Sequence, residues 1–462
     1  MQQISSVREQ FASRAGFILM TAGCAIGLGN VWRFSYIAGQ YGGGFFMLLY
    51  LFFLVVLGFP VMLMELSLGR SSRSTYPGAF RNLQQPGSRF PWHKPAYLLF
   101  SGNLILLMFY TVITGWLLIY SCKFLSGTFR NIAPEKCPEI FNTILENPWL
   151  QTIGTLAALI MTFAVCVGGV RKTIEKVIKV MMAGLFLLLG MLVLQSLQLP
   201  DAANGLKYFL QPDWNKFVGD GIFATVHAAM AQAFFTLSLG IGSIAVCGSY
   251  MNSNNSLVRE GVWIIVLDTI VAVASGLIIF PACASFNISP DSGPPLIFIT
   301  LPHIFDSMPC GVLWGTLFFV FLAIAALSTL IAVFENLVAF GMDEWKWTRK
   351  FSCTVFGIIL MLASLPCIFG FNLWKNFQPL GKNSNILDLE DFIVSDNLLP
   401  LGALYLTLFC LTRYGWGRKN FFAAVNSGSG AKLPEKLAPW LLFILPAVIL
   451  CIWVAGLIIR FK

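Results

Sequence analysis

The chain has 462 residues, of which 57% are hydrophobic and only 11% are charged, and its mean hydropathy is +0.76. Soluble globular proteins contain about 45–50% apolar and about 25% charged residues, so the composition excludes that class and indicates an integral membrane protein. The formal net charge is +9, but cytoplasmic loops account for such an excess in a membrane protein. We therefore expect the protein to lie in the lipid bilayer, and we do not expect it to bind nucleic acid.

Eleven apolar stretches are long enough to cross a bilayer as helices. We expect an all-α protein with spans near 15–37, 44–69, 97–122, 148–168, 177–198, 217–249, 260–284, 311–341, 352–372, 392–412 and 437–459. With the N-terminus inside, about two thirds of the 30 Lys and Arg residues lie in cytoplasmic loops. An odd number of spans then places the C-terminus outside. A disulfide between Cys137 and Cys310, both in expected outer segments, is left open.

The first and sixth spans contain sequences that weaken a helix. Residues 23–30 read GCAIGLGN and residues 235–243 read FTLSLGIGS. Glycine costs about 1 kcal/mol relative to alanine within a helix, and Asn, Ser and Thr offer competing hydrogen bonds. The glycines could instead serve close helix packing, but two such sites about 210 residues apart favour broken helices of an inverted repeat. The expected organisation is one half at 1–198, a second at 217–412, and an additional span at 437–459.

Broken helices can hold ions of both signs. Half-helix N-termini present free N–H groups to a carboxylate, while unwound carbonyls face a cation. Residues 23–34, with Gly27 and Gly29 before Asn30 and Arg33, and residues 234–240 (FFTLSLG) resemble the neurotransmitter:sodium symporter family in its bacterial amino-acid branch. The similarity runs from about residue 8 to 412 and implies a leucine-transporter-like fold, a 5+5 inverted repeat with helices 1 and 6 broken.

The resemblance implies two sodium sites. The first would use Ala25, Asn30, Thr236 and Asp268, and the second would use Gly23, Ile26, Ala325, Ser328 and Thr329. Because Asp268 brings its own negative charge beside the cation, no chloride requirement is expected. An isolated intramembrane acid is costly, which favours a functional role for Asp268 over a structural hydrogen bond.

A substrate site is implied at the same breaks. Its residues would be Ala25, Gly27, Leu28, Gly29, Leu106, Tyr110, Phe235, Thr236, Ser238, Ile241, Thr329 and Val333. None of these side chains is charged, so a charged side chain on the substrate would stay unpaired in a medium of low dielectric constant. The expected substrate is a neutral, hydrophobic L-amino acid.

The resemblance also implies two closures. Arg33 and Asp391 would form the outer gate, while Arg8 and Asp343, supported by Tyr250, would form the inner one. The role of Glu335 is left open: it could belong to an inner hydrogen-bond network or serve as a proton site.

The sequence thus predicts a sodium-coupled amino-acid symporter of a bacterial inner (plasma) membrane, with no catalytic residues. Two alternatives stay open. One is a proton-coupled carrier that uses Asp268 or Glu335, and the other is a non-transporting amino-acid receptor on the same scaffold. A membrane enzyme is third, because neither a nucleophile–base pair nor a phosphate loop is found.

Overall fold

The computed structural model describes residues 8–132, 136–219, 221–252, 254–286, 296–382 and 384–460, and in these ranges the chain is helical without strands. This confirms the all-α class. Nine helical segments are long and apolar enough to cross a bilayer: Gly44–Ser72, His93–Leu125, Pro148–Cys166, Val170–Ser196, Leu257–Ser285, Gly311–Glu344, Arg349–Phe369, Ile386–Leu411 and Glu435–Arg460. The bent pair Arg14–Ala25 and Gly29–Gln40, whose axes differ by 57°, brings the number in these ranges to ten.

The expected sixth span is two short helices, so the predicted count of eleven is approximate. The elements used below are α1 (Arg14–Ala25), η1 (Gly29–Arg33), α2 (Phe34–Gln40), α3 (Gly44–Phe53), α4 (Phe59–Ser72), α6 (His93–Leu125), α8 (Pro148–Cys166), η3 (Val170–Ile174), α9 (Glu175–Ser196), α12 (Ile222–Thr236), α13 (Ser243–Ser249), α14 (Leu257–Ser285), α16 (Gly311–Glu344), α17 (Arg349–Phe369), α18 (Ile386–Asp391), η5 (Phe392–Leu398), α19 (Leu399–Leu411) and α21 (Leu445–Arg460).

Local sequence sets several of the helix starts. Ser13, Asn147, Ser256 and Thr348 each accept a hydrogen bond from the N–H three residues on, which satisfies a donor that has no partner in the first turn. At the start of α18, Asn385 and Asp388 form a reciprocal capping box. The tenth span therefore begins at Ile386 and not at residue 392 as predicted, because a hydropathy window penalises the acidic first turn.

The fifth span also begins earlier than predicted. Residues 170–176 are helical although Arg171, Lys172 and Lys176 make them hydrophilic, so the expected start at residue 177 was wrong. Short helices outside the predicted spans were not expected from hydropathy either: α5 (Tyr76–Leu83), α7 (Lys136–Glu146), α10 (Ala202–Leu210), α11 (Trp214–Gly219), α15 (Leu301–Ser307) and α20 (Arg418–Val425). The thiols of Cys137 and Cys310 are both free.

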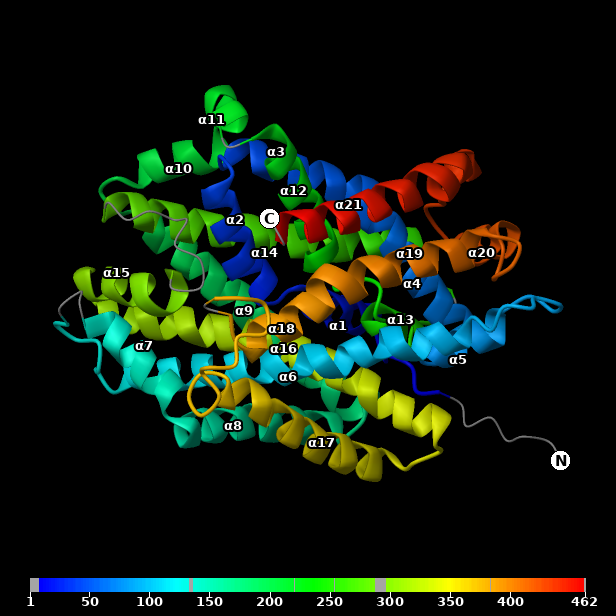
Figure 1. Ribbon diagram of the computed structural model, residues 1–462, viewed down its shortest axis with the longest axis horizontal. Helices are drawn as coiled ribbons and strands as arrows, with labels where there is room; N and C mark the ends of the chain where they lie inside the picture. Colours follow the sequence, from blue (N-terminus) through cyan, green and yellow to red (C-terminus); the bar gives the residue numbers. More distant parts are fainter. Residues whose placement is uncertain are drawn as a thin grey trace.

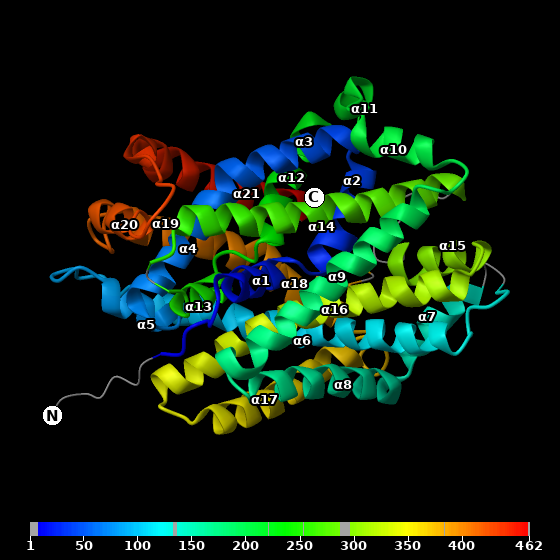
Figure 2. The same ribbon diagram turned by 180° about the vertical axis from the view of Figure 1, so that it is seen from behind.

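Helices α1, α6 and α16 form the centre of the bundle (Figures 1 and 2). The apolar windows of α6 and α16 are 72% and 83% buried, whereas that of the last span is only 22% buried and leaves most of its apolar surface for lipid. Helix α1 contacts α9, α13, α14 and α16. Both helix breaks therefore meet inside the protein, where backbone that lacks helical partners is tolerated.

Candidate functional site

The first break follows the end of α1 at Ala25. Ile26 leaves the helical conformation, with φ −70° and ψ 104°, and the chain resumes as η1 after Leu28. The N–H of Gly27 donates to the amide oxygen of Asn30 at 3.1 Å. A Cβ atom on Gly27 would overlap the hydroxyl groups of Tyr110 and Thr329, so glycine is required for this close approach.

The second break separates α12 from α13. Ser238, Gly240 and Gly242 have φ values of 50°, 100° and 88°, a left-handed backbone that no helix contains. The carboxylate of Glu65 accepts the Gly242 N–H at 2.6 Å and so braces the unwound segment from α4. A Cβ on Gly402 of α19 would overlap the carbonyl of Gly240, so these two backbones touch.

Three of the residues expected at the first sodium site meet between the breaks. The amide nitrogen of Asn30 lies 3.0 Å from the hydroxyl of Thr236 and 2.8 Å from the carboxylate of Asp268. Thr236 donates to Asp268 at 3.1 Å, and Tyr50 donates to it at 3.3 Å. All four side chains are buried. Ala25, the fourth expected residue, is buried at the end of α1, where the last carbonyls lack helical donors.

The five residues expected at the second sodium site are also together. The hydroxyl of Ser328 lies 3.2 Å from the Gly23 carbonyl and 2.8 Å from that of Ala325. The hydroxyl of Thr329 lies 3.2 Å from the Gly23 carbonyl and 3.1 Å from that of Ile26. Among the described residues, His, Cys, Asp and Glu form no cluster of three that could hold a transition metal. The carbonyl, hydroxyl and carboxylate oxygens of the two sets are the type of ligand that a hard cation such as sodium prefers.

The residues expected to bind substrate surround the first break. The N–H of Leu28 donates to the Tyr110 hydroxyl at 3.0 Å. A Cβ on Gly29 would lie 2.6 Å from the ring of Phe235, which places this ring over the break. Leu106, Ile241, Thr329 and Val333 are buried, and Phe235 and Ser238 are half-buried. Every side chain in the set is uncharged, as the sequence indicated.

The sequence analysis did not predict a polar network that lies next to these residues. Asn103, one turn before Leu106, donates to the carbonyl of Ile241 at 2.7 Å, and its amide oxygen accepts from Ser243 at 2.7 Å and from Asn336 at 3.1 Å. Asn103 and Asn336 are fully buried. The network thus joins α6 and α16 to the unwound segment and to the start of α13. Two intramembrane asparagines were its only signal in the sequence.

The two residues expected at the outer gate have other partners in this structure. The guanidinium of Arg33 lies over the ring of Phe235, 4.0 Å from its centroid. Asp391 instead accepts a hydrogen bond from Ser395 at 2.6 Å within its own helix. Within the part of the chain that the structure describes, Arg33 forms no ion pair with Asp391 or with any other acid.

The inner closure brings its expected residues together. Arg8 pairs with Asp343 at 2.6 Å, and its guanidinium lies 4.7 Å from the centroid of Tyr250. Burial lowers the pKa of Arg8, but Tyr250 and Asp343 raise it, so that the net pKa lies above its ordinary value. Tyr250 donates to Glu335 at 2.7 Å, and Glu335 holds Arg349 through contacts of 2.7 and 2.8 Å. Of the two alternatives for Glu335, the structure places it in an inner hydrogen-bond network.

Two glutamates connect the segment before α1 to the start of the fifth span. Each accepts hydrogen bonds from the other segment, and we call these bonds the exchanged caps. Glu9 accepts from the N–H of Val170 at 2.8 Å, at the beginning of η3. Glu175 in turn accepts from the N–H of Ala12 at 2.7 Å and from the Ser13 hydroxyl at 2.8 Å. Glu9 thereby satisfies a donor at the start of η3, and Glu175 satisfies donors at the start of α1.

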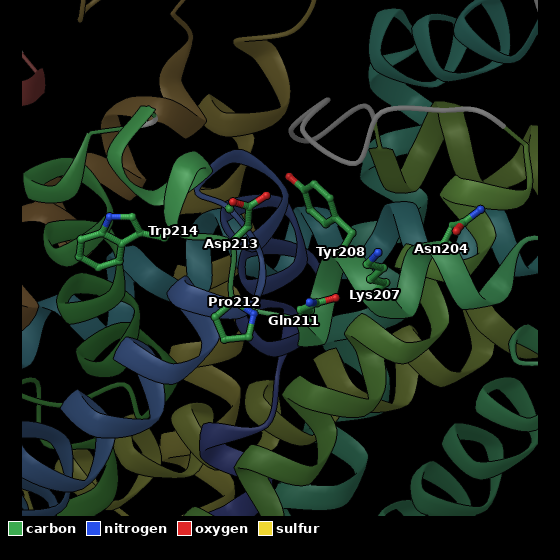
Figure 3. Close-up of a pocket in the computed structure, with 8 residues that line it drawn as sticks. Asn204, Lys207, Tyr208, Gln211, Pro212, Asp213 and Trp214 are labelled. Atoms are coloured by element: carbon green, nitrogen blue, oxygen red, sulfur yellow. The ribbon is translucent and has the colours of Figure 1, made fainter.

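A groove of about 490 Å³ lies at α10 and α11, away from the expected site residues (Figure 3). Lys207, Tyr208, Asp213 and Trp214 are among its lining residues. None of the residues that line this groove belongs to either helix break.

The comparisons agree with this geometry. The profile of the Sodium:neurotransmitter symporter family matches residues 8–152 and 144–460. The uncharacterized sodium-dependent transporter YhdH of Bacillus subtilis (strain 168) is 34% identical over 423 residues, which cover 91% of each chain. An uncharacterized sodium-dependent transporter of Haemophilus influenzae is 31% identical over 462 residues, covering 97% of this chain and 98% of that protein.

Among solved structures, MhsT in complex with L-phenylalanine matches with a TM-score of 0.86 and 35% identity, covering 97% of this chain and 100% of that one. The match spans both helix breaks and confirms the leucine-transporter-like fold that the sequence implied. The chain therefore belongs to the Sodium:neurotransmitter symporter family, whose members are sodium-coupled transporters and not enzymes.

Proposed function

We propose that this chain imports neutral, hydrophobic L-amino acids together with sodium, by alternating access and without chloride. The observation that carries the proposal is an oxygen-rich cluster with one carboxylate at the first break, beside the Tyr110 hydroxyl and the Phe235 ring. Asn30, Thr236 and Asp268 form the cluster. We expect the buried, uncharged side chains of Leu106, Ile241 and Val333 to surround the substrate. The L-phenylalanine in the MhsT structure supports the same substrate class.

The two ligands are coupled through the first break. A substrate carboxylate held at the Leu28 N–H and the Tyr110 hydroxyl would lie beside the first sodium ion, so each ligand raises the affinity for the other. Asp268 supplies the charge that offsets the cation, which makes chloride unnecessary. The N-terminus lies in the cytoplasm, the C-terminus outside, and the membrane is a plasma membrane, in line with the positive-inside rule.

Uptake into proteoliposomes tests the proposal. An inward sodium gradient should drive accumulation of labelled hydrophobic amino acids, a potassium gradient should not, and Asn30→Ala should abolish the uptake. Replacing chloride by gluconate should leave it unchanged; loss of uptake in gluconate would show that Asp268 does not replace chloride. Accumulation driven by a pH gradient in sodium-free buffer would favour a proton-coupled carrier. Sodium-dependent binding without accumulation would favour a receptor.

A further inference from the structure

Arg33 is held above the expected substrate site with part of its guanidinium unused. Its Nη1 atom is buried and has no hydrogen-bond partner among the described residues. A buried donor atom without a hydrogen-bond partner is costly. The guanidinium can therefore donate a hydrogen bond to an acidic side chain when the path above Phe235 closes.

An acid on η5 lines the same cavity as Arg33. Arg33, Phe235, Ser395 and Asp396 line one cavity of about 40 Å³, together with residues of α12, α19 and α21. Asp391 does not line it. A cavity of this size has room for water, so the side chains around it must come closer together when the path closes.

The π-helical backbone brings Asp396 to nearly the same side of the span as Asp391, one turn further along. In an α-helix, residues five apart differ by about 140° in direction. In a π-helix the N–H of residue i+5 bonds to the carbonyl of residue i, which brings residues five apart nearly into line. Asp391 precedes this segment and already accepts from Ser395 at 2.6 Å. The π turn therefore gives the gate a second acid, five residues beyond the one expected from the family pattern.

The last span borders the same region. Arg460, at the end of α21, lies 6.0 Å from the ring centroid of Phe392. Trp453 donates to the amide oxygen of Asn397 at 3.2 Å, so α21 and η5 are joined.

We infer that Asp396, and not Asp391, is the acid that pairs with Arg33 when the outer path closes over bound substrate. Asp396 acts here as a positioning residue: it holds Arg33 in its place over Phe235 and slows the return of substrate to the outside. Water leaves the cavity on closure, and this strengthens the attraction between the two charges. The inference rests on the proposed function, because it assumes an amino acid beneath Phe235.

Dissociation of labelled amino acid from the full-length protein tests the inference. The protein is loaded in sodium buffer with the best substrate of the uptake panel and diluted into unlabelled substrate. Asp396→Asn should speed dissociation about tenfold, as loss of one partner of a buried charge pair mainly raises the dissociation rate. The matched control Asp391→Asn should change the rate less than about twofold.

A double-mutant cycle separates pairing from a structural effect. If Asp396 acts through Arg33, the rate of Arg33→Gln/Asp396→Asn should match that of Arg33→Gln alone. Asp396→Glu should restore most of the slow release, and sodium-dependent thermal stabilisation of each variant checks folding. Faster release in Asp391→Asn alone, or additive effects of Arg33→Gln and Asp396→Asn, would overturn the inference. Absence of sodium-dependent binding in the unaltered protein would instead overturn the proposed function.

Discussion

The amide of Asn30 donates a hydrogen bond of 2.8 Å to the carboxylate of Asp268, across 238 residues of sequence. Thr236 and Tyr50 donate to the same carboxylate. The one formal charge of the expected first sodium site is thus fixed by three side chains from η1, α12 and α3. A cation held by the Asn30 amide oxygen would require this amide to turn, because its nitrogen now faces the carboxylate and its oxygen accepts from the Gly27 N–H.

Replacing Asp268 with Asn should weaken sodium binding. The substitution keeps the shape of the side chain and removes the only formal negative charge of the cluster. We expect the sodium concentration for half-maximal uptake to rise about tenfold, equivalent to about 1.4 kcal/mol. Asp201→Asn, which alters an exposed acid, is the control and should leave the sodium dependence unchanged. Identical sodium curves for the two variants would argue against a cation at Asp268.

The second cluster can be tested with isosteric changes in α16. Ser328→Ala and Thr329→Val should each raise the sodium requirement several-fold, because each removes a hydroxyl that faces carbonyls of α1. Ser275→Ala is a matched control: Ser275 is buried in α14, but its hydroxyl bonds only to the carbonyl of Val271, one turn away in the same helix. Equal effects of Ser275→Ala and Ser328→Ala on sodium dependence would mean that the hydroxyls only satisfy their helices.

The network around Asn103 should control substrate selectivity. Asn103→Leu removes the donor that holds the Ile241 carbonyl and leaves Ser243 without its acceptor. We expect the ratio of aromatic to aliphatic uptake to change by about tenfold, since a buried hydrogen bond contributes about 1 kcal/mol and its loss leaves unpaired groups. Thr111→Val, on the same helix, removes a bond only to Leu107 and serves as control. An unchanged ratio in Asn103→Leu would show that the network does not shape the pocket.

The pair between Glu335 and Arg349 should matter for stability. The side chain of Glu335 is 0% exposed and that of Arg349 is 13% exposed. Breaking a buried pair costs about 3–5 kcal/mol, so Arg349→Gln should lower the thermal unfolding temperature in detergent clearly. Lys179→Gln breaks the more exposed pair with Glu175 and should cost less than about 1 kcal/mol. Adding Glu335→Gln to Arg349→Gln should recover part of the loss; further destabilisation would contradict a simple ion pair.

The contact between Gly240 and Gly402 should not tolerate a methyl group. Gly240 has a φ of 100°, and a Cβ on either residue would overlap backbone of the other segment. Gly402→Ala should therefore abolish folded, sodium-stabilised protein in detergent extracts. Gly184→Ala lies in α9 with no atom within 4 Å of the added Cβ, so it should be neutral or slightly stabilising. Normal yield of Gly402→Ala would indicate that the two segments can separate.

The sequence could predict the spans, both helix breaks and the residues around them, because these follow from local apolar length and from glycine beside small polar residues. The breaks fall at Ile26 and at 237–242, inside the stretches that the glycine pattern indicated. The helix ends were less predictable. A hydropathy window cannot recognise Arg171 or Asp388 as helical, although backbone hydrogen bonds and caps continue the helix beyond the apolar region.

Contacts between distant segments could not be predicted from local patterns. Asn103 and Ser243 are 140 residues apart, and nothing in either sequence neighbourhood indicates that they meet. The position of Asp396 depends on a π turn, which has no composition signal of its own. The family resemblance indicated Asp391, because a resemblance matches residues in sequence order. The side chain that lines the cavity with Arg33 depends instead on the local helix geometry.

The exchanged caps of Glu9 and Glu175 have a consequence for release to the cytoplasm. The bonds that these two carboxylates accept from Val170, Ala12 and Ser13 can be replaced by bonds to water, at a net cost of about 1.5–3 kcal/mol each, the range for hydrogen bonds to charged groups. Detachment of residues 8–13 would then hydrate the inner ends of α1 and α9, and Met182 of α9 lies beside Gly23 of the second cluster. Opening at this end of the protein would thus hydrate the two carboxylates and would also separate the ring of Phe11 from those of Phe17 and Tyr250.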